Sequence, residues 1–150
     1  RERACALLAG LPGLTVPEGR AAFAEAEAVL GAPFAGGLFG PGSRGEAGIA
    51  GAFGRARLSG RLDRLVIAPG RAMAVDFKTD RRVPDRPEDA PEAYLVQLGA
   101  YADALARVFP DREIALALLW TASPRLMPVP SALAREALAR HGVPERDPGA

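Results

Sequence analysis

Two short apolar runs that each carry an aspartate constrain the fold of this sequence more than any other feature. Residues 61–67 and 71–77 are mostly apolar, and the Ala-Pro-Gly of residues 68–70 separates them, which predicts a β-hairpin. Asp63 lies within the first run and Asp76 near the end of the second. A carboxylate among apolar strand neighbours is costly unless it is paired or bound to a metal. We therefore expect the functional site at this hairpin.

Strand alternation indicates which side chains of the second run share a face. It places Asp76 and Lys78 on one face and Val75 and Phe77 on the other. Because Asp63 faces them across the hairpin, we predict that Asp63, Asp76 and Lys78 converge in one cleft.

The remaining pattern predicts an α/β fold, with a small mixed sheet flanked by helices on both faces, as a single domain over residues 1–150. Periodicity and end signals predict helices at 1–11, 20–30, 92–109 and 135–140, the last with Ser131 as its N-cap. A continuous apolar run predicts a strand at 113–121 that is covered on both faces. Edge strands are expected at 45–50 and 126–129, within or after segments rich in Gly and Pro, and an irregular solvated loop at 80–91.

Composition narrows the functional classes. The chain is 49% hydrophobic and 25% charged, as in ordinary globular proteins, and no apolar run reaches the ~20 residues that cross a bilayer. The single cysteine, Cys5, excludes an internal disulfide framework and any four-cysteine metal site within this sequence, and it fits a cytoplasmic setting. With a net charge of only +1, DNA contacts must come from local clusters, such as Arg55 with Arg57 or Arg81 with Arg82, or from attached domains.

Two strand aspartates with a lysine two residues after the second are suited to cutting a phosphodiester. The carboxylates of Asp63 and Asp76 can hold Mg²⁺, which prefers oxygen ligands, and Lys78 can orient the attacking water or stabilise the phosphoryl oxygens. The pattern alone leaves other interpretations open. Asp76 and Lys78 can be solvated charges at a strand end, and Asp63 can form a salt bridge with Arg64 or a neighbour.

The order of three short motifs adds specificity. Gly60-x-x-Asp63-Arg64, then Asp76-x-Lys78-Thr79, then Gln97-x-x-x-Tyr101 on the following helix together resemble the RecB-type nucleases of the PD-(D/E)XK superfamily. Gln97 and Tyr101 are four residues apart and share a helix face. The resemblance implies Asp63 and Asp76 as metal ligands and Lys78 as the catalytic cation. It also implies residues that shape the site or contact DNA, which are Gln97, Tyr101, Arg64 and Thr79.

Longer strings extend the resemblance over nearly the whole chain. Y-L-V-Q-L-G-A-Y, A-L-L-W-T-A-S-P-R-L-M and F-G-P-G-S-R-G-E-A-G-I-A-G are similar to the C-terminal nuclease domain of the AddA helicase-nuclease family, especially its alphaproteobacterial form. That family implies a bacterial, cytoplasmic, nucleoid-associated machine for double-strand-break repair and recombination, with an AddB-like partner subunit, DNA as substrate, and Mg²⁺ or Mn²⁺ as cofactor. It also implies an ATP-driven helicase motor N-terminal to Arg1, and the absence of a phosphate-binding loop motif here agrees with that division. We therefore expect this chain to be part of a longer protein.

One departure from the family concerns its histidine ligand on the first helix. Cys5 stands at that position, and a thiol is a soft ligand that suits Mg²⁺ poorly. Either Asp63, Asp76 and water suffice for the metal, or the activity is impaired. His141, the single histidine, lies far along the chain and is expected to be a solvated residue at a helix end.

Three interpretations follow from these patterns. The first is a metal-dependent DNA nuclease, in which Glu46 of the Ser-Arg-x-Glu segment is either a further residue near the metal or a surface charge. The second is a nuclease-derived module, catalytically impaired, that guides DNA or docks a subunit. The third is an unrelated soluble α/β binding domain, which requires all the motifs to be coincidental.

Overall fold

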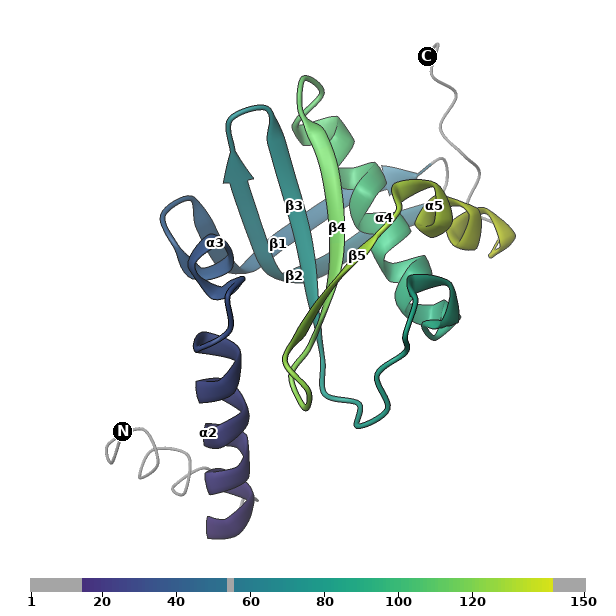
Figure 1. Ribbon diagram of the computed structural model, residues 1–150. Helices are drawn as coiled ribbons and strands as arrows, with labels where there is room; N and C mark the ends of the chain where they lie inside the picture. Colours follow the sequence, from purple (N-terminus) through teal and green to yellow (C-terminus); the bar gives the residue numbers. More distant parts are fainter. Residues whose placement is uncertain (1–14, 54–55, 142–150) are drawn as a thin grey trace.

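The structure is a computed structural model that describes residues 15–53 and 56–141. The helix expected at residues 1–11, and Cys5 with it, lie outside the described residues. Five strands form one sheet in the order β1-β2-β3-β4-β5 (Figure 1). The strands are β1 (Ser43–Phe53), β2 (Ala56–Ala68), β3 (Arg71–Lys78), β4 (Glu113–Trp120) and β5 (Arg125–Val129). Only β3 and β4 are parallel, so the sheet is mixed as expected.

Helices cover both faces of the sheet. They are α2 (Val16–Leu30), α3 (Ala35–Phe39), the 3-10 turn η1 (Pro87–Asp89), α4 (Glu92–Val108) and α5 (Ser131–Arg140). Helix α4 connects the parallel strands β3 and β4, which is the connection that a parallel pair requires. It lies on one face with α5, whereas α3 and the end of α2 cover the other (Figure 1).

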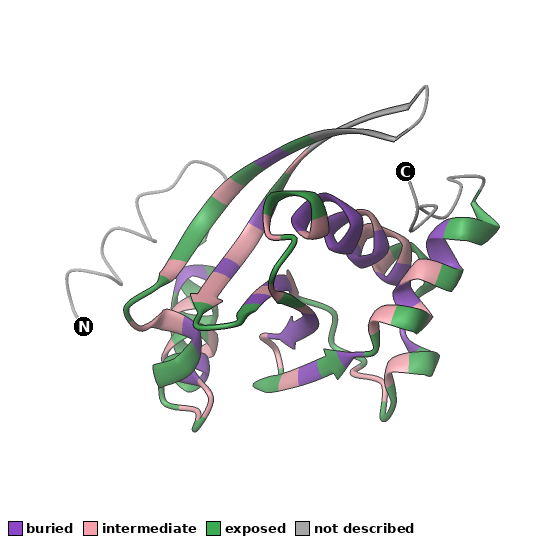
Figure 2. Cartoon of the chain, turned by 90° about the horizontal axis from the view of Figure 1, so that it is seen from above, coloured by how far each residue is buried: buried purple, intermediate pink, exposed green. Residues whose placement is uncertain are grey.

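Strand β4 lies between two hydrophobic cores. Its alternate residues Leu116, Leu118 and Trp120 face the core beneath α4, while Ala117 and Leu119 face the smaller core with α2 and α3. Figure 2 shows the buried side of α4 turned toward the sheet. The continuous apolar run in the sequence is therefore explained by burial on both faces.

The β2–β3 hairpin turns tightly. Ala68 pairs with Arg71, so only Pro69 and Gly70 form the loop, and Gly70 has a φ of +70°, a left-handed conformation that glycine adopts without strain. The predicted hairpin is confirmed, although its loop is one residue shorter than expected.

An irregularity in β2 places Asp63 at a fork in the sheet. Pairing of β2 with β3 begins at Arg64, whereas β2 stays paired with β1 on both sides of Asp63. Opposite Asp63, Glu46 has a φ of +55°, and the Glu46–Asp63 pair is missing from the ladder. Leu62 and Leu65 consequently both face the core beneath α4, which strict alternation would forbid. The β1–β2 arm thus leaves β3 at Asp63.

The segment at residues 32–54 differs most from expectation. The sequence predicts an irregular stretch with a weak edge strand at 45–50, but the structure contains α3 and an 11-residue strand β1. Pairing with the long strand β2 stabilises this glycine-rich backbone, a tertiary effect that local composition does not reveal. Helix α2 also begins earlier than expected, because Thr15 and Glu18 form a capping box.

The predicted N-cap role of Ser131 is wrong. Helix α5 begins at Ser131 itself, and the Ser131 hydroxyl donates to the carbonyl of Ile114 at 3.1 Å, tying the helix to β4. The helix at 92–109 and the strands at 113–121 and 126–129 are confirmed to within one residue at each end. Among the described residues, no helix is both long and apolar enough to span a membrane.

The crossing of α4 and α5 depends on Gly99. A Cβ atom added at Gly99 would lie 2.4 Å from the Ala134 carbonyl oxygen and 2.9 Å from the Leu138 Cβ. We expect Gly99→Ala to lower the free energy of unfolding by about 1–3 kcal/mol, measured by urea denaturation, because backbone must move to admit the methyl group. Gly36→Ala is the control, since its Cβ would meet nothing within 4 Å. Equal stability of Gly99→Ala and the wild type would contradict this crossing.

Candidate active site

The Asp76 carboxylate is the centre of the candidate site. Asp76 is 3% exposed and, among the described residues, only Asp103 is a second buried charged residue. The two differ in setting, because Asp103 faces Arg135 across the α4–α5 crossing, whereas Asp76 faces the polar side of α4. Burial raises the pKa of Asp76 and the nearby Asp63 raises it further, while Lys78 opposes this by stabilising the charged form.

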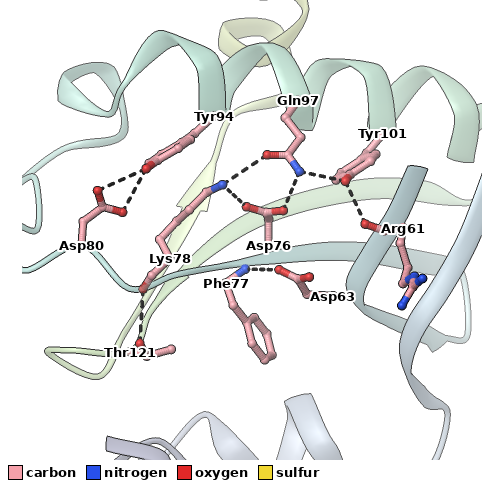
Figure 3. A network of polar contacts seen from close by, with 10 residues as sticks. All are labelled: Arg61, Asp63, Asp76, Phe77, Lys78, Asp80, Tyr94, Gln97, Tyr101 and Thr121. Carbon is pink, nitrogen blue, oxygen red and sulfur yellow. Dashed lines mark hydrogen bonds and ion pairs between the residues drawn. The ribbon is translucent and has the colours of Figure 1, made fainter. Parts of the chain in front are cut away.

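The Lys78 ammonium lies in the same buried network (Figure 3). Its Nζ atom is 2.5 Å from Asp76 Oδ2, and it donates a hydrogen bond of 3.2 Å to Gln97 Oε1. The Lys78 side chain is 12% exposed and that of Asp76 is 4% exposed, so the ion pair is largely removed from water. Val75 and Phe77 pack in the core on the opposite face, as strand alternation predicts.

Gln97 and Tyr101 connect α4 to two strands. The Gln97 Nε2 atom donates to Asp76 Oδ1 at 2.9 Å and to the Tyr101 hydroxyl at 2.8 Å. The Tyr101 hydroxyl donates in turn to the backbone carbonyl of Arg61 on β2 at 2.9 Å. These contacts fix the orientation of the Gln97 amide, whose oxygen faces Lys78 and whose nitrogen faces Asp76 (Figure 3).

Asp63 lies beside this network and has a local structural partner. Its Oδ2 accepts a hydrogen bond of 2.7 Å from the backbone N–H of Phe77. Because β2 separates from β3 at this point, the carboxylate takes the place of a strand carbonyl. Asp63 directly precedes Arg64, the first β2 residue that pairs with β3, and because Arg64 is paired with Val75, Asp63 stands opposite Asp76.

Three other candidates do not join the network. Arg64 lies on the opposite face of the sheet, where its guanidinium is 4.7 Å from the centre of the Phe39 ring and donates to Ser43. Glu46 accepts a hydrogen bond of 2.7 Å from Arg61 at the surface. Thr79 is exposed and makes no polar contact within the part of the chain that the structure describes.

Two residues in the network were not singled out from the sequence. The Tyr94 ring centre lies 3.7 Å from Lys78 Nζ, and the Tyr94 hydroxyl donates to Asp80 at 3.0 Å and 3.2 Å (Figure 3). In the sequence, Tyr94 belongs to the apolar stripe of its helix and Asp80 to a charged loop. The available signal was spacing, since Tyr94 lies three residues before Gln97 on the same helix face.

The raised pKa of Asp76 has a measurable consequence for stability. The native state holds this proton more tightly than the unfolded chain, so ionisation lowers native stability as pH rises above the ordinary value of 3.8. We therefore expect Asp76→Asn to gain stability relative to the wild type as pH rises from about 3 to about 7, when both are compared by urea denaturation. A stability difference that is independent of pH, or that changes in the opposite direction, would contradict the raised pKa.

Comparison with known proteins assigns the chain to a family. The sequence model of the PD-(D/E)XK nuclease superfamily matches residues 13–142. No curated protein matches the chain in sequence.

One solved structure shows the same fold, and a second gives a weaker superposition. A crystal structure of a protein from Eubacterium rectale with the provisional name exonuclease superimposes with a TM-score of 0.58 at 14% identity, covering 83% of this chain and 50% of that protein. The chain thus spans about half the length of that protein. The crystal structure of SSO0001 gives a TM-score of 0.40 at 16% identity, over 95% of this chain and 72% of that one. From the family match over most of its length, we conclude that the chain belongs to the PD-(D/E)XK nuclease superfamily.

Proposed function

We propose that this chain is a divalent-metal-dependent DNA nuclease that hydrolyses phosphodiester bonds of linear DNA as an exonuclease. The observation that carries the proposal is the buried pair of Asp76 and Lys78, held by Gln97 beside Asp63, in a member of a nuclease superfamily. A buried carboxylate with a raised pKa and a specific cationic partner is a typical feature of functional sites. The name of the Eubacterium rectale protein agrees with an exonuclease activity.

The donor set fits the divalent cation that nucleases of this superfamily typically use. Asp63 and Asp76 offer hard oxygen ligands, and buried Asp76 Oδ2 accepts no hydrogen bond from the described residues apart from its ion-pair contact with Lys78. Within the described ranges, no group of three or more His, Cys, Asp and Glu side chains is positioned to hold a metal. Mg²⁺ accepts such a site, because it commonly binds one or two carboxylates and retains several waters. Asp63 and Asp76 would therefore hold Mg²⁺ or Mn²⁺.

The protein's own groups have distinct tasks in the proposed reaction. A bound divalent ion supplies positive charge to the phosphodiester and lowers the pKa of water. Lys78 brings a second positive charge to the phosphoryl oxygens, and the low water content around it strengthens that interaction. Gln97 holds Asp76 and Lys78 in fixed orientation, and Tyr101 anchors Gln97 to β2.

The motifs shared with the AddA family support a more specific setting. We propose that the domain belongs to a bacterial helicase-nuclease that processes double-strand breaks for repair and recombination, with an N-terminal ATP-driven motor and an AddB-like partner subunit. Its place of action is then the nucleoid in the cytoplasm. The exposed arginines Arg81 and Arg82, which follow the site in the chain, are candidates for contact with the DNA backbone.

A second candidate function rests on Cys5. If the cysteine at the family's histidine position prevents metal binding, the domain is a catalytically impaired nuclease fold that guides DNA or docks a subunit. The two candidates differ in whether the Asp76–Lys78 pair is needed for cutting.

Substitution at the buried pair separates these candidates. Asp76→Ala and Lys78→Met should each lower magnesium-dependent degradation of linear DNA by about 10²-fold or more, because the first removes a ligand of the metal and the second removes the positive charge at the phosphoryl oxygens. The assay measures DNA products from the full protein, with any partner nuclease disabled. Asp103→Asn is the matched control, since Asp103 is also buried but faces Arg135, and it should retain the wild-type rate. ATP hydrolysis by the motor should be unchanged in all three variants. Degradation by Asp76→Ala at the wild-type rate would refute a catalytic role.

The two tasks assigned to Asp63 can be separated in the same way. In Asp63→Asn the side-chain oxygen can still accept from the Phe77 N–H, so stability should stay within about 1 kcal/mol of the wild type. Loss of the charge should nevertheless weaken Mn²⁺ binding, measured by calorimetry, by about tenfold or more. Asp63→Ala should in addition lose about 1–3 kcal/mol of stability, because the Phe77 N–H is left without its partner. Unchanged metal affinity in Asp63→Asn would assign Asp63 to structure alone.

A further inference from the structure

The Lys78 ammonium contacts an aromatic face as well as its polar partners. The Tyr94 ring centre is 3.7 Å from Nζ, close enough for a cation–π interaction with a side chain that is only 12% exposed. In Figure 3, Tyr94 and Gln97 reach toward Lys78 from the same helix, while Asp76 approaches from the sheet. The ammonium therefore has partners on α4 that are independent of Asp76.

The Tyr94 ring is itself held in position. Its hydroxyl donates to both carboxylate oxygens of Asp80, at 3.0 Å and 3.2 Å, and the ring packs against Trp120 at a centroid distance of 6.2 Å. The hydrogen bond to Asp80 raises the pKa of Tyr94, because the phenol donates to a carboxylate. Asp80 lies two residues beyond Lys78, so one short segment supplies both the cation and the anchor of its aromatic partner.

If the proposed function holds, the Asp76 carboxylate interacts with two cations, the Lys78 ammonium and a divalent metal ion. Its Oδ2 is now 2.5 Å from the lysine Nζ, and its Oδ1 accepts from Gln97. A divalent ion on this carboxylate would repel the ammonium, because like charges a few ångströms apart interact strongly in a site with little water. The lysine then needs a binding place that does not depend on Asp76.

We propose that Tyr94, fixed by Asp80, is that second binding place, and that it keeps Lys78 in the site while Asp76 is engaged by a divalent cation. Tyr94 is thus a positioning residue for Lys78, and this inference rests on the proposed function. Without the ring, the lysine depends more on Asp76 and competes with the metal for it. The strength of a desolvated cation–π contact corresponds to a loss of metal affinity of about five- to thirtyfold.

The test compares substitutions that keep or remove the aromatic face, using Mn²⁺ as the probe. Calorimetric titration of the full protein should give affinity within about twofold of the wild type for Tyr94→Phe, which retains the ring, and the five- to thirtyfold loss for Tyr94→Leu. Asp80→Asn should fall between them, with Asp85→Asn as a control from the same exposed loop. Thermal melting of every variant identifies any that is unfolded. Because Tyr94→Phe keeps the ring and Tyr94→Leu removes it, the difference between the two reports on the aromatic face.

A double-mutant cycle shows whether the effect acts through the lysine. In a Lys78→Met background, Tyr94→Leu should change Mn²⁺ affinity by less than about twofold, because no ammonium remains to compete for Asp76. The turnover of DNA by Tyr94→Leu should also fall with little change in KM, and Tyr94→Phe should restore it. An equal effect of Tyr94→Leu with and without Lys78 would overturn the inference.

Asp76→Ala distinguishes failure of this inference from failure of the proposed function. If Asp76→Ala loses Mn²⁺ binding while the Tyr94 series shows wild-type affinity, the metal site stands and the role of Tyr94 is refuted. If Asp76→Ala binds Mn²⁺ as the wild type does, the proposed function itself fails and takes the inference with it.

Discussion

The buried Asp76 carboxylate is the group on which the arrangement of the surrounding polar side chains depends. Asp76 lies between the sheet and α4 at 3% exposure, where a charge survives only with partners. Lys78 lies on β3, the same strand as Asp76, whereas Gln97 lies on the crossover helix α4. Tyr101, also on α4, extends the network to the β1–β2 arm. The network therefore sets how α4 sits on the sheet, in addition to the apolar contacts beneath it. Stability and the proposed chemistry depend here on the same few groups, as expected where a fold tolerates a local conflict for function.

Much of the fold could be predicted from the spacing of apolar residues, because in a regular helix or strand this spacing shows which faces are buried. The apolar stripe of α4 and the continuous run of β4 each report which faces are covered, so these elements were predicted to within one residue at each end. The β1–β2 arm was not predicted well, because its glycine-rich strand is stabilised by pairing with β2 rather than by local preference. The irregularity at Glu46 and Asp63 breaks the alternation on which the prediction relied.

The candidate site was likewise predicted only in part. Alternation correctly put Asp76 and Lys78 on one face, and helical spacing put Gln97 and Tyr101 together. The family resemblance implied Arg64 as a site residue, but Arg64 directly follows Asp63 in the strand and faces the other side of the sheet, where it contacts Phe39. Tyr94 escaped notice since an aromatic residue in an apolar stripe is usually core. Its ring in fact meets an ammonium and its hydroxyl a carboxylate, a pairing set by the loop after β3.

The hydrogen bonds of the site run in a single direction. Lys78 donates to Gln97, Gln97 donates to Tyr101, and Tyr101 donates to the Arg61 carbonyl. A carbonyl oxygen can only accept, so the last bond cannot reverse, and the orientation of every group before it is determined from that end. An amide in the middle also lacks a proton that it can readily release. The network is therefore an anchor and not a proton wire, and any proton that the proposed reaction moves must travel by another route.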